Sequence, residues 1–218
     1  VNSLSALQMT IEPNREIQSI NFHLNNLSKI RLVLSQPLLA GEVYRLHLQG
    51  AKDCSGNIMT SANSSLPFGV SSQALWKDII INEVMADPSP TRLLPEAEYI
   101  ELFNRSDKLI NLHNWTITDS GAPITVQQAI VLPDSFLILC SAQHLQLFKQ
   151  FGKALALNNF PSLSNSGEPI TLRNAEGILI DSIHYKDSWY LDTDKKDGGW
   201  SLELIDKENT CAEETNWA

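Results

Sequence analysis

Three glutamates lie close together in the sequence, among predicted strands. Glycoside hydrolysis usually depends on a pair of carboxylates that face each other across the scissile bond, so these residues are candidates for that chemistry. Glu83 is the fifth residue of the largely apolar run IIINEV, while Glu98 and Glu101 are the two ends of the segment EYIE. The alternation of side chains along a strand predicts that Glu98 and Glu101 point to opposite faces. The alternative is structural, because buried carboxylates accept hydrogen bonds. We favour that role for Glu83 and Glu101, with backbone amides or a basic side chain as the expected donors.

Other catalytic patterns are missing from the sequence. The five histidines are scattered, and none has the HExxH spacing of a metal site. The GxSxG motif of a serine nucleophile is absent. The ten glycines are spread through turns and do not form a phosphate-binding loop. We therefore expect that the protein is not an enzyme.

The densest acidic stretch, KDSWYLDTDKKDGG, is a candidate calcium loop. Counted from Asp192, it places acidic residues at positions one, three and twelve of such a loop. Position five is Lys196, however, and the required glycine falls one residue late, at Gly198. The candidate metal ligands are Asp192, Asp194, Asp197 and Glu203. A solvated loop without any metal or cofactor is the favoured interpretation, and a loose surface calcium site is the alternative.

Two aromatic residues beside this loop are candidates for a contact surface. Trp189 and Tyr190 precede the acidic stretch and are predicted to be exposed, where they would contact a glycan or a protein. Trp115 and Trp200 lie in strand patterns with apolar neighbours, which predicts that both belong to the core.

The three cysteines have neither CxxC spacing nor adjacent histidines, so a zinc site is not expected. An odd number allows at most one intramolecular disulfide. Cys140 ends a predicted strand and Cys211 follows the last one, so this pair is the candidate bridge and Cys54 is expected to stay unpaired. The alternative is three free thiols that behave as small core residues.

Charge is distributed unevenly along the 218 residues, whose formal net charge is −9. Residues 1–74 carry five Lys and Arg against four Asp and Glu, whereas residues 75–218 carry eleven against twenty-one. An acidic surface repels phosphate backbones, so nucleic acid is not an expected partner. No stretch approaches about 20 uninterrupted apolar residues, so no membrane span is expected. Val1 begins no signal-peptide pattern, and we interpret the sequence as a fragment of a longer mature chain.

Strand-like alternation runs through the whole chain. Residues 1–74 contain the alternating pieces LQMTIEP, IQSINFHL, KIRLVLSQPL and EVYRLHLQ. A shift to Ser, Gly and small residues in Pro67–Trp76 predicts a boundary between two domains. In residues 75–218 the pattern changes only at HLQLFKQF, residues 144–151, which predicts one short helix.

The second domain resembles the lamin tail domain, an immunoglobulin-like module of nuclear lamins and of many bacterial surface proteins. The matching motifs are INEVMADPSP, EYIELFNRS, LHNWTITD, LPDSFLILC, FPSLSNSGEPITLRNAEGILIDSIHY and GGWSLELID. In the first domain, SQPLLAGEVYRLHLQGAKDCSGN resembles the last strands of bacterial Ig-like repeats. These resemblances imply an all-β protein with two tandem immunoglobulin-like β-sandwich domains: residues 1–74, a partial Ig-like domain, and residues 75–218, a lamin tail domain.

The resemblance also implies a function. A non-catalytic structural or adhesive module of a secreted or cell-surface bacterial protein is expected, acting as a spacer or as a contact for proteins or glycans. Its first partners would be neighbouring domains of the same larger protein. Two alternatives stay open: an accessory carbohydrate-binding module that uses Trp189 and Tyr190, and a metal-assisted hydrolase that uses the acidic residues.

Overall fold

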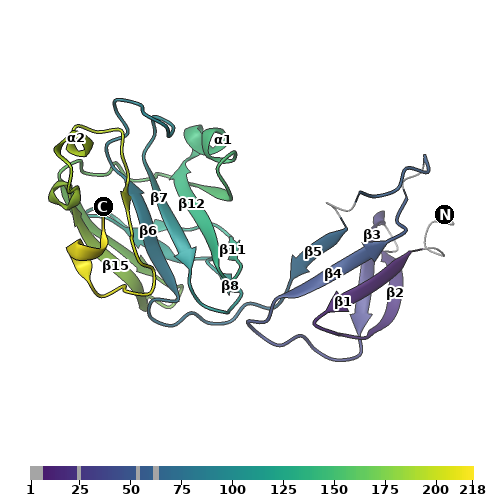
Figure 1. Ribbon diagram of the computed structural model, residues 1–218. Helices are drawn as coiled ribbons and strands as arrows, with labels where there is room; N and C mark the ends of the chain where they lie inside the picture. The colour runs from purple at the N-terminus through teal and green to yellow at the C-terminus, as the bar shows by residue number, and fades with distance from the viewer. Residues whose placement is uncertain (1–6, 24–25, 53–54, 61–63) are drawn as a thin grey trace. The chain divides into compact units, whose positions relative to one another are not determined.

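The protein, described here by a computed structural model, consists of two compact units built mainly of strands (Figure 1). The structure describes residues 7–23, 26–52, 55–60 and 64–218. Unit 1 is Val1–Ser71 and unit 2 is Ser72–Ala218, where the sequence predicted a boundary after residue 74. The all-β fold class is confirmed. Among the described residues, no helix has the length and apolar character needed to cross a membrane.

Unit 1 contains a three-stranded sheet and a two-stranded ribbon, both antiparallel. In sheet order the strands are β1 (Gln8–Glu12), β4 (Tyr44–Gln49) and β5 (Ser65–Phe68), and the ribbon is β2 (Ile17–His23) and β3 (Asn26–Leu34). Tyr44 is fully buried beneath the Arg15 guanidinium, which lies 4.8 Å from the centre of its ring. Ile20 and Ile30 of the ribbon stay 40% and 41% exposed, so its apolar face is only partly covered.

The larger sheet of unit 2 has five strands, and Figure 1 shows β7 between β6 and β12. In sheet order the strands are β13 (Ala154–Leu157), β12 (Ser135–Ser141), β7 (Tyr99–Asn104), β6 (Ile79–Met85) and β16 (Leu202–Glu203). Ile79, Ile80 and Ile81 are all buried, because β6, which lies between β7 and β16, is covered on both faces at these residues. This explains why β6 reads as an apolar run and not as an alternation.

A second sheet of four strands covers the larger one. Its strands in order are β10 (Ile124–Thr125), β9 (Thr116–Thr118), β14 (Gly167–Arg173) and β15 (Leu179–Lys186), and a small pair joins β8 (Ile110–Asn111) to β11 (Ile130–Val131). The inward residues of both sheets, such as Leu102, Ile170 and Tyr185, form one core. Strand β15 is the last member of its sheet.

One strand pair departs from the antiparallel sandwich that the sequence predicts. Strands β12 and β13 pair in parallel, and parallel neighbours need a crossover of about a dozen residues or more. That crossover contains the short helices η2 (Ala142–His144) and α1 (Leu145–Phe148), so the helix predicted near residues 144–151 is confirmed. A second four-residue helix, α2 (Thr193–Lys196), was not predicted.

Two glycines fix the path of the chain into β16. Gly198 and Gly199 have φ angles of +91° and +81°, a region that residues with a Cβ rarely adopt. A Cβ at Gly198 would overlap the carbonyl oxygen of Ser89. The Gly199 amide donates to the Asp87 carbonyl at 2.8 Å. The GGW motif is therefore docked on the ADPSP loop, and the chain emerges beside the edge of β6.

A buried ion pair joins the two sheets. Asp181 of β15 is 1% exposed and forms an ion pair with Lys77, two residues before β6. Its Oδ2 also accepts the Ile81 amide at 2.7 Å. Because a buried carboxylate is costly unless it is paired and hydrogen-bonded, this arrangement holds β15 against β6.

Candidate functional site

Three glutamates stand side by side on neighbouring strands of the five-stranded sheet. Strand register places Glu83 of β6 opposite Glu203 of β16 on one side and opposite Glu101 of β7 on the other. Opposed residues of antiparallel strands have Cβ atoms about 4.5–5.5 Å apart, so the three carboxylates are neighbours. Their strand neighbours Val84 and Leu102 face the core, so the glutamates project from the opposite, outer face. We call Glu83, Glu101 and Glu203 the acidic row.

Glu83 occupies the centre of the acidic row. Burial raises the pKa of its carboxyl group above the ordinary value, and the charge of Glu203 raises it further. Hydrogen bonds from the hydroxyl groups of Tyr99 and Ser201 act in the opposite direction. The pKa of the Tyr99 hydroxyl is raised in turn, mainly by burial and then by Glu83. The central carboxylate is thus partly removed from water. Among the described residues, no cation lies beside it to balance its charge.

Glu101 is the most strongly perturbed member of the acidic row. Burial, and then the neighbouring charge of Glu83, raise its pKa from 4.5 to about 7. The Asn82 side-chain amide donates to Glu101 Oε1 at 3.0 Å and lowers the pKa in part. The donors expected from the sequence, backbone amides or a basic side chain, are therefore wrong for both Glu83 and Glu101. Side-chain hydroxyl and amide groups take that place.

Glu98 lies outside the acidic row. It lines a cavity of about 330 Å³ together with Glu96 and His144, and burial raises its pKa. The sequence correctly separates Glu98 from Glu101, because residues three apart on an extended strand face opposite ways. His144 Nδ1 pairs with Ser141 Oγ at 3.0 Å, and the Ser141 side chain makes no capping hydrogen bond to η2.

The acidic row lacks the form of a glycosidase site. Glycosidase carboxylates flank the scissile bond from opposite sides of a cleft, whereas these side chains project together from one sheet face. The three cavities of about 540, 510 and 330 Å³ in unit 2 are lined by neither Glu83 nor Glu101. What the row can do is hold a proton on Glu101 near neutral pH, since burial and the neighbouring charge of Glu83 raise the pKa of that carboxyl group to about 7.

The proposed calcium ligands do not come together. The Asp192 side chain caps α2 by accepting the Asp194 amide at 2.9 Å, and Asp197 ends the same helix. Glu203 lies in β16 and belongs to the acidic row. Within the described ranges, no group of three His, Cys, Asp or Glu side chains is arranged to hold a metal ion.

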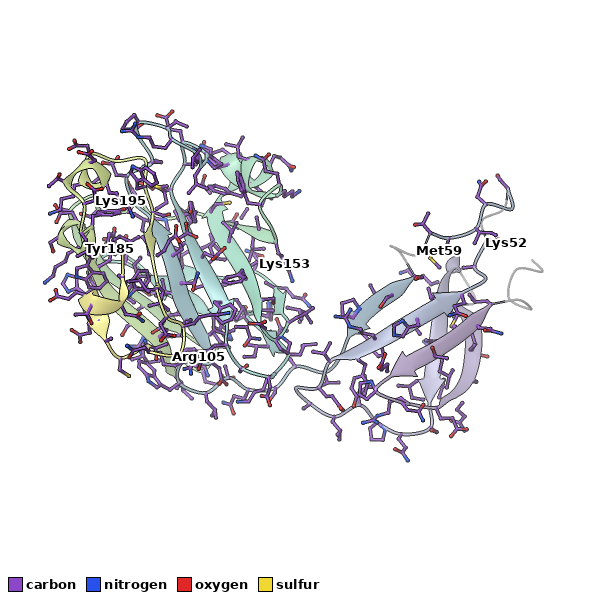
Figure 2. The ribbon with its side chains drawn as sticks, viewed as in Figure 1. Lys52, Met59, Arg105, Lys153, Tyr185 and Lys195 are labelled. Atoms are coloured by element: carbon purple, nitrogen blue, oxygen red, sulfur yellow. The ribbon has the colours of Figure 1, made fainter. Side chains whose placement is uncertain are left out.

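The predicted exposure of Trp189 and Tyr190 is wrong, since both side chains are buried. Trp189 packs against Trp217 with ring centres 5.9 Å apart, and the Tyr190 hydroxyl donates to the Trp200 carbonyl at 2.6 Å. Trp115 is buried as predicted. Trp200, predicted to be core, is instead 37% exposed, and the Lys195 ammonium lies 5.7 Å from the centre of its ring. Lys195 belongs to α2 and is labelled in Figure 2.

The disulfide predicted between Cys140 and Cys211 is absent, and both are free thiols. Cys140 is fully buried on the outer side of β12, where it packs with Met85 and Phe148. Cys211 is exposed in the chain that follows β16. Cys54, predicted to stay unpaired, lies outside the described residues.

A groove of about 540 Å³ lies beside the end of β15 and was not predicted. Its lining includes Pro169 and Thr171 of β14, the exposed residues Ser182, His184 and Lys186 of β15, and Glu213 and Glu214 of η4 (Glu213–Asn216). Trp189 and Trp217 also line it. We call it the β15 groove. The alternation in DSIHYK could have predicted which β15 residues face outward into the groove. No local pattern predicts that the C-terminal segment lies beside them.

The two sheets of unit 2, packed face to face around one core, define an immunoglobulin-like β-sandwich. The sequence profile of the Lamin Tail Domain matches residues 72–187, more than half of the chain. The chain therefore belongs to the lamin tail domain family. The match includes Glu83 and Glu101 but ends before Glu203. Neither a curated protein nor a solved structure matches the chain.

Proposed function

We propose that this chain is a non-catalytic structural and adhesive module of a secreted or cell-surface bacterial protein. It would space the neighbouring domains of the longer protein and contact proteins or glycans. The observation that carries this proposal is the lamin tail domain match over residues 72–187, since modules of this immunoglobulin-like kind generally have no catalytic activity.

The construction of unit 2 supports the spacer role. The Asp181–Lys77 ion pair holds its two sheets together, and the glycines of the GGW motif tie the chain before β16 to the ADPSP loop. Trp189 and Tyr190 are used in packing. A glycan contact, if the module makes one, therefore needs a surface other than the pair predicted from the sequence.

Surface proteolysis of intact bacterial cells tests the location. Brief trypsin treatment of cells that express the longer protein should release peptides from exposed positions such as Lys149 and Arg173, detected by mass spectrometry. A cytoplasmic protein in the same cells serves as the control and should yield none. Peptides that appear only after the cells are broken would contradict a secreted or surface location.

A domain replacement separates the spacer role from the adhesive role. In the longer protein, residues 72–218 are exchanged for an unrelated immunoglobulin-like module of similar size. If the unit acts only as a spacer, the replacement restores the function that a deletion abolishes. If the unit makes a specific contact, the replacement fails. Full function after simple deletion would refute both roles.

A further inference from the structure

Strand β15 ends in an edge whose backbone groups are unpaired. The Asp187 amide donates to the Ser166 carbonyl at 3.4 Å, which makes the next pair, Lys186 with Gly167, a non-hydrogen-bonded pair of the antiparallel ladder. Two residues further along, His184 faces Pro169 in the same kind of pair, which suits a residue without an N–H group. His184 and Lys186 therefore direct their own N–H and C=O groups away from β14, and no described strand pairs with them there.

The β15 groove lies against this free edge. Its lining also includes Glu213 and Glu214, and neither carboxylate has a basic partner among the described residues. A cavity of about 540 Å³ is within the range of small binding sites, about 300–1,000 Å³.

An unsatisfied donor lies in the same place. Trp189, which lines the groove, is 7% exposed, and its indole Nε1 has no acceptor in the part of the chain that the structure describes. Buried polar groups normally have a hydrogen-bond partner, and an exception calls for an explanation. Because the Nε1 atom is itself buried, an occupant of the groove accepts its hydrogen bond only after the indole ring moves.

We propose that the β15 groove binds an extended peptide strand with basic side chains, which pairs with the free backbone of β15. Addition of a strand to an open edge uses main-chain hydrogen bonds for affinity and alternate side chains for specificity. A basic strand is favoured because the unpaired Glu213 and Glu214 outnumber Lys186, the lining lysine that has no carboxylate partner among the described residues; the other, Lys77, is paired with Asp181. The net charge of −9 also steers cations toward the chain. This inference deepens the adhesive role proposed above and rests on it.

Titration of the whole ¹⁵N-labelled chain with a capped six-residue peptide of alternating Lys and Val tests the proposal. The amide signals of His184 and Lys186 should shift as peptide is added, and their hydrogen exchange should slow. A matched peptide of alternating Glu and Val should bind at least tenfold more weakly. Added salt should weaken the binding of the Lys–Val peptide, because part of the attraction is between exposed charges.

Two variants remove the two halves of the site. His184→Pro deletes the N–H group at the edge, and the double variant Glu213→Gln with Glu214→Gln removes the opposite charge. Each should weaken binding of the Lys–Val peptide about tenfold or more, whereas Glu176→Gln, at an exposed turn, should not. The glutamine pair also covers the case in which His184→Pro does not fold.

Binding that is equal for both peptides, or unchanged in the glutamine double variant, would overturn the proposal. So would shifts confined to residues outside the groove, or no shift at all. None of these outcomes touches the non-catalytic role of the module, which depends on turnover and not on peptide binding. The two conclusions can therefore fail separately.

Discussion

Replacing Glu101 with glutamine should remove a pH-dependent loss of stability from unit 2. Glutamine keeps the size of the side chain and its ability to accept from Asn82, but it cannot ionise. In the folded protein the pKa of Glu101 is raised, so folding favours its protonated form. Stability is therefore greatest below about pH 4.5, where the carboxyl group is protonated in both states, and falls as the pH rises through about 7.

The size of this loss follows from the same pKa change. One pKa unit corresponds to about 1.4 kcal/mol, so the rise from 4.5 to about 7 sets an upper limit of about 3 kcal/mol. Glu101 is half-buried, and the water that reaches it screens part of the repulsion from Glu83. We therefore expect a loss of about 1–2 kcal/mol between pH 5 and pH 8 from this residue.

Urea unfolding of the whole chain, followed by tryptophan fluorescence at pH 5, 6, 7 and 8, measures the effect. Fluorescence reports on unit 2 alone, because it contains all five tryptophans: Trp76, Trp115, Trp189, Trp200 and Trp217. The Glu101→Gln variant should match the original protein near pH 5 and exceed its free energy of unfolding at pH 8. Glu83 and Glu98 also have raised pKa values, so some pH dependence should remain in the variant.

Glu96 provides a control of opposite sign. Hydrogen bonds from the hydroxyl groups of Ser89 and Thr91 lower its pKa, so its carboxylate stabilises the fold above the ordinary pKa and that stability is lost as the pH falls. Glu96→Gln should therefore gain no stability at pH 8. If Glu101→Gln has the same pH dependence as the original protein, or is less stable at pH 8, the reasoning about the acidic row is refuted.

Three further outcomes are expected. Asp181→Asn breaks a buried ion pair and should lower the free energy of unfolding of unit 2 by about 3 kcal/mol in the same urea assay. At Gly198 an alanine would have to adopt a positive φ, and its Cβ would overlap the Ser89 carbonyl, so Gly198→Ala should lower the free energy of unfolding by about 1–3 kcal/mol. A melting temperature equal to that of the original protein would contradict this. Iodoacetamide should label Cys211 in the native protein within minutes but Cys140 only after unfolding, as judged by peptide mass mapping, because Cys140 is buried and burial raises its thiol pKa.

Local patterns in the sequence predicted most of the fold. Strand alternation placed Glu98 and Glu101 on opposite faces, and the apolar run before Glu83 indicated a strand covered on both sides. The spacing of Leu145 and Phe148 located α1. Each of these inferences depends on residues a few positions apart, where the period of the backbone determines which way a side chain points.

The main errors concern contacts between distant parts of the chain. Glu203 joins Glu83 because the GGW motif docks on the ADPSP loop, and no local pattern contains that contact. Trp189 was predicted to be exposed because acidic residues follow it, but Trp217 packs over it from the C-terminal segment. The free edge of β15 likewise depends on the order of strands in the sheet, which the sequence does not state.

The most direct test of the account is a turnover assay. The purified chain is incubated with polysaccharides, nucleic acids and phosphoesters, with and without added divalent metals, beside the Glu83→Gln and Glu101→Gln variants. No turnover is expected from any of the three proteins, since the acidic row projects from one face of one sheet and the cavities of about 540, 510 and 330 Å³ are lined by neither Glu83 nor Glu101. Reproducible turnover that disappears in either variant, while its fluorescence shows a folded unit 2, would contradict it.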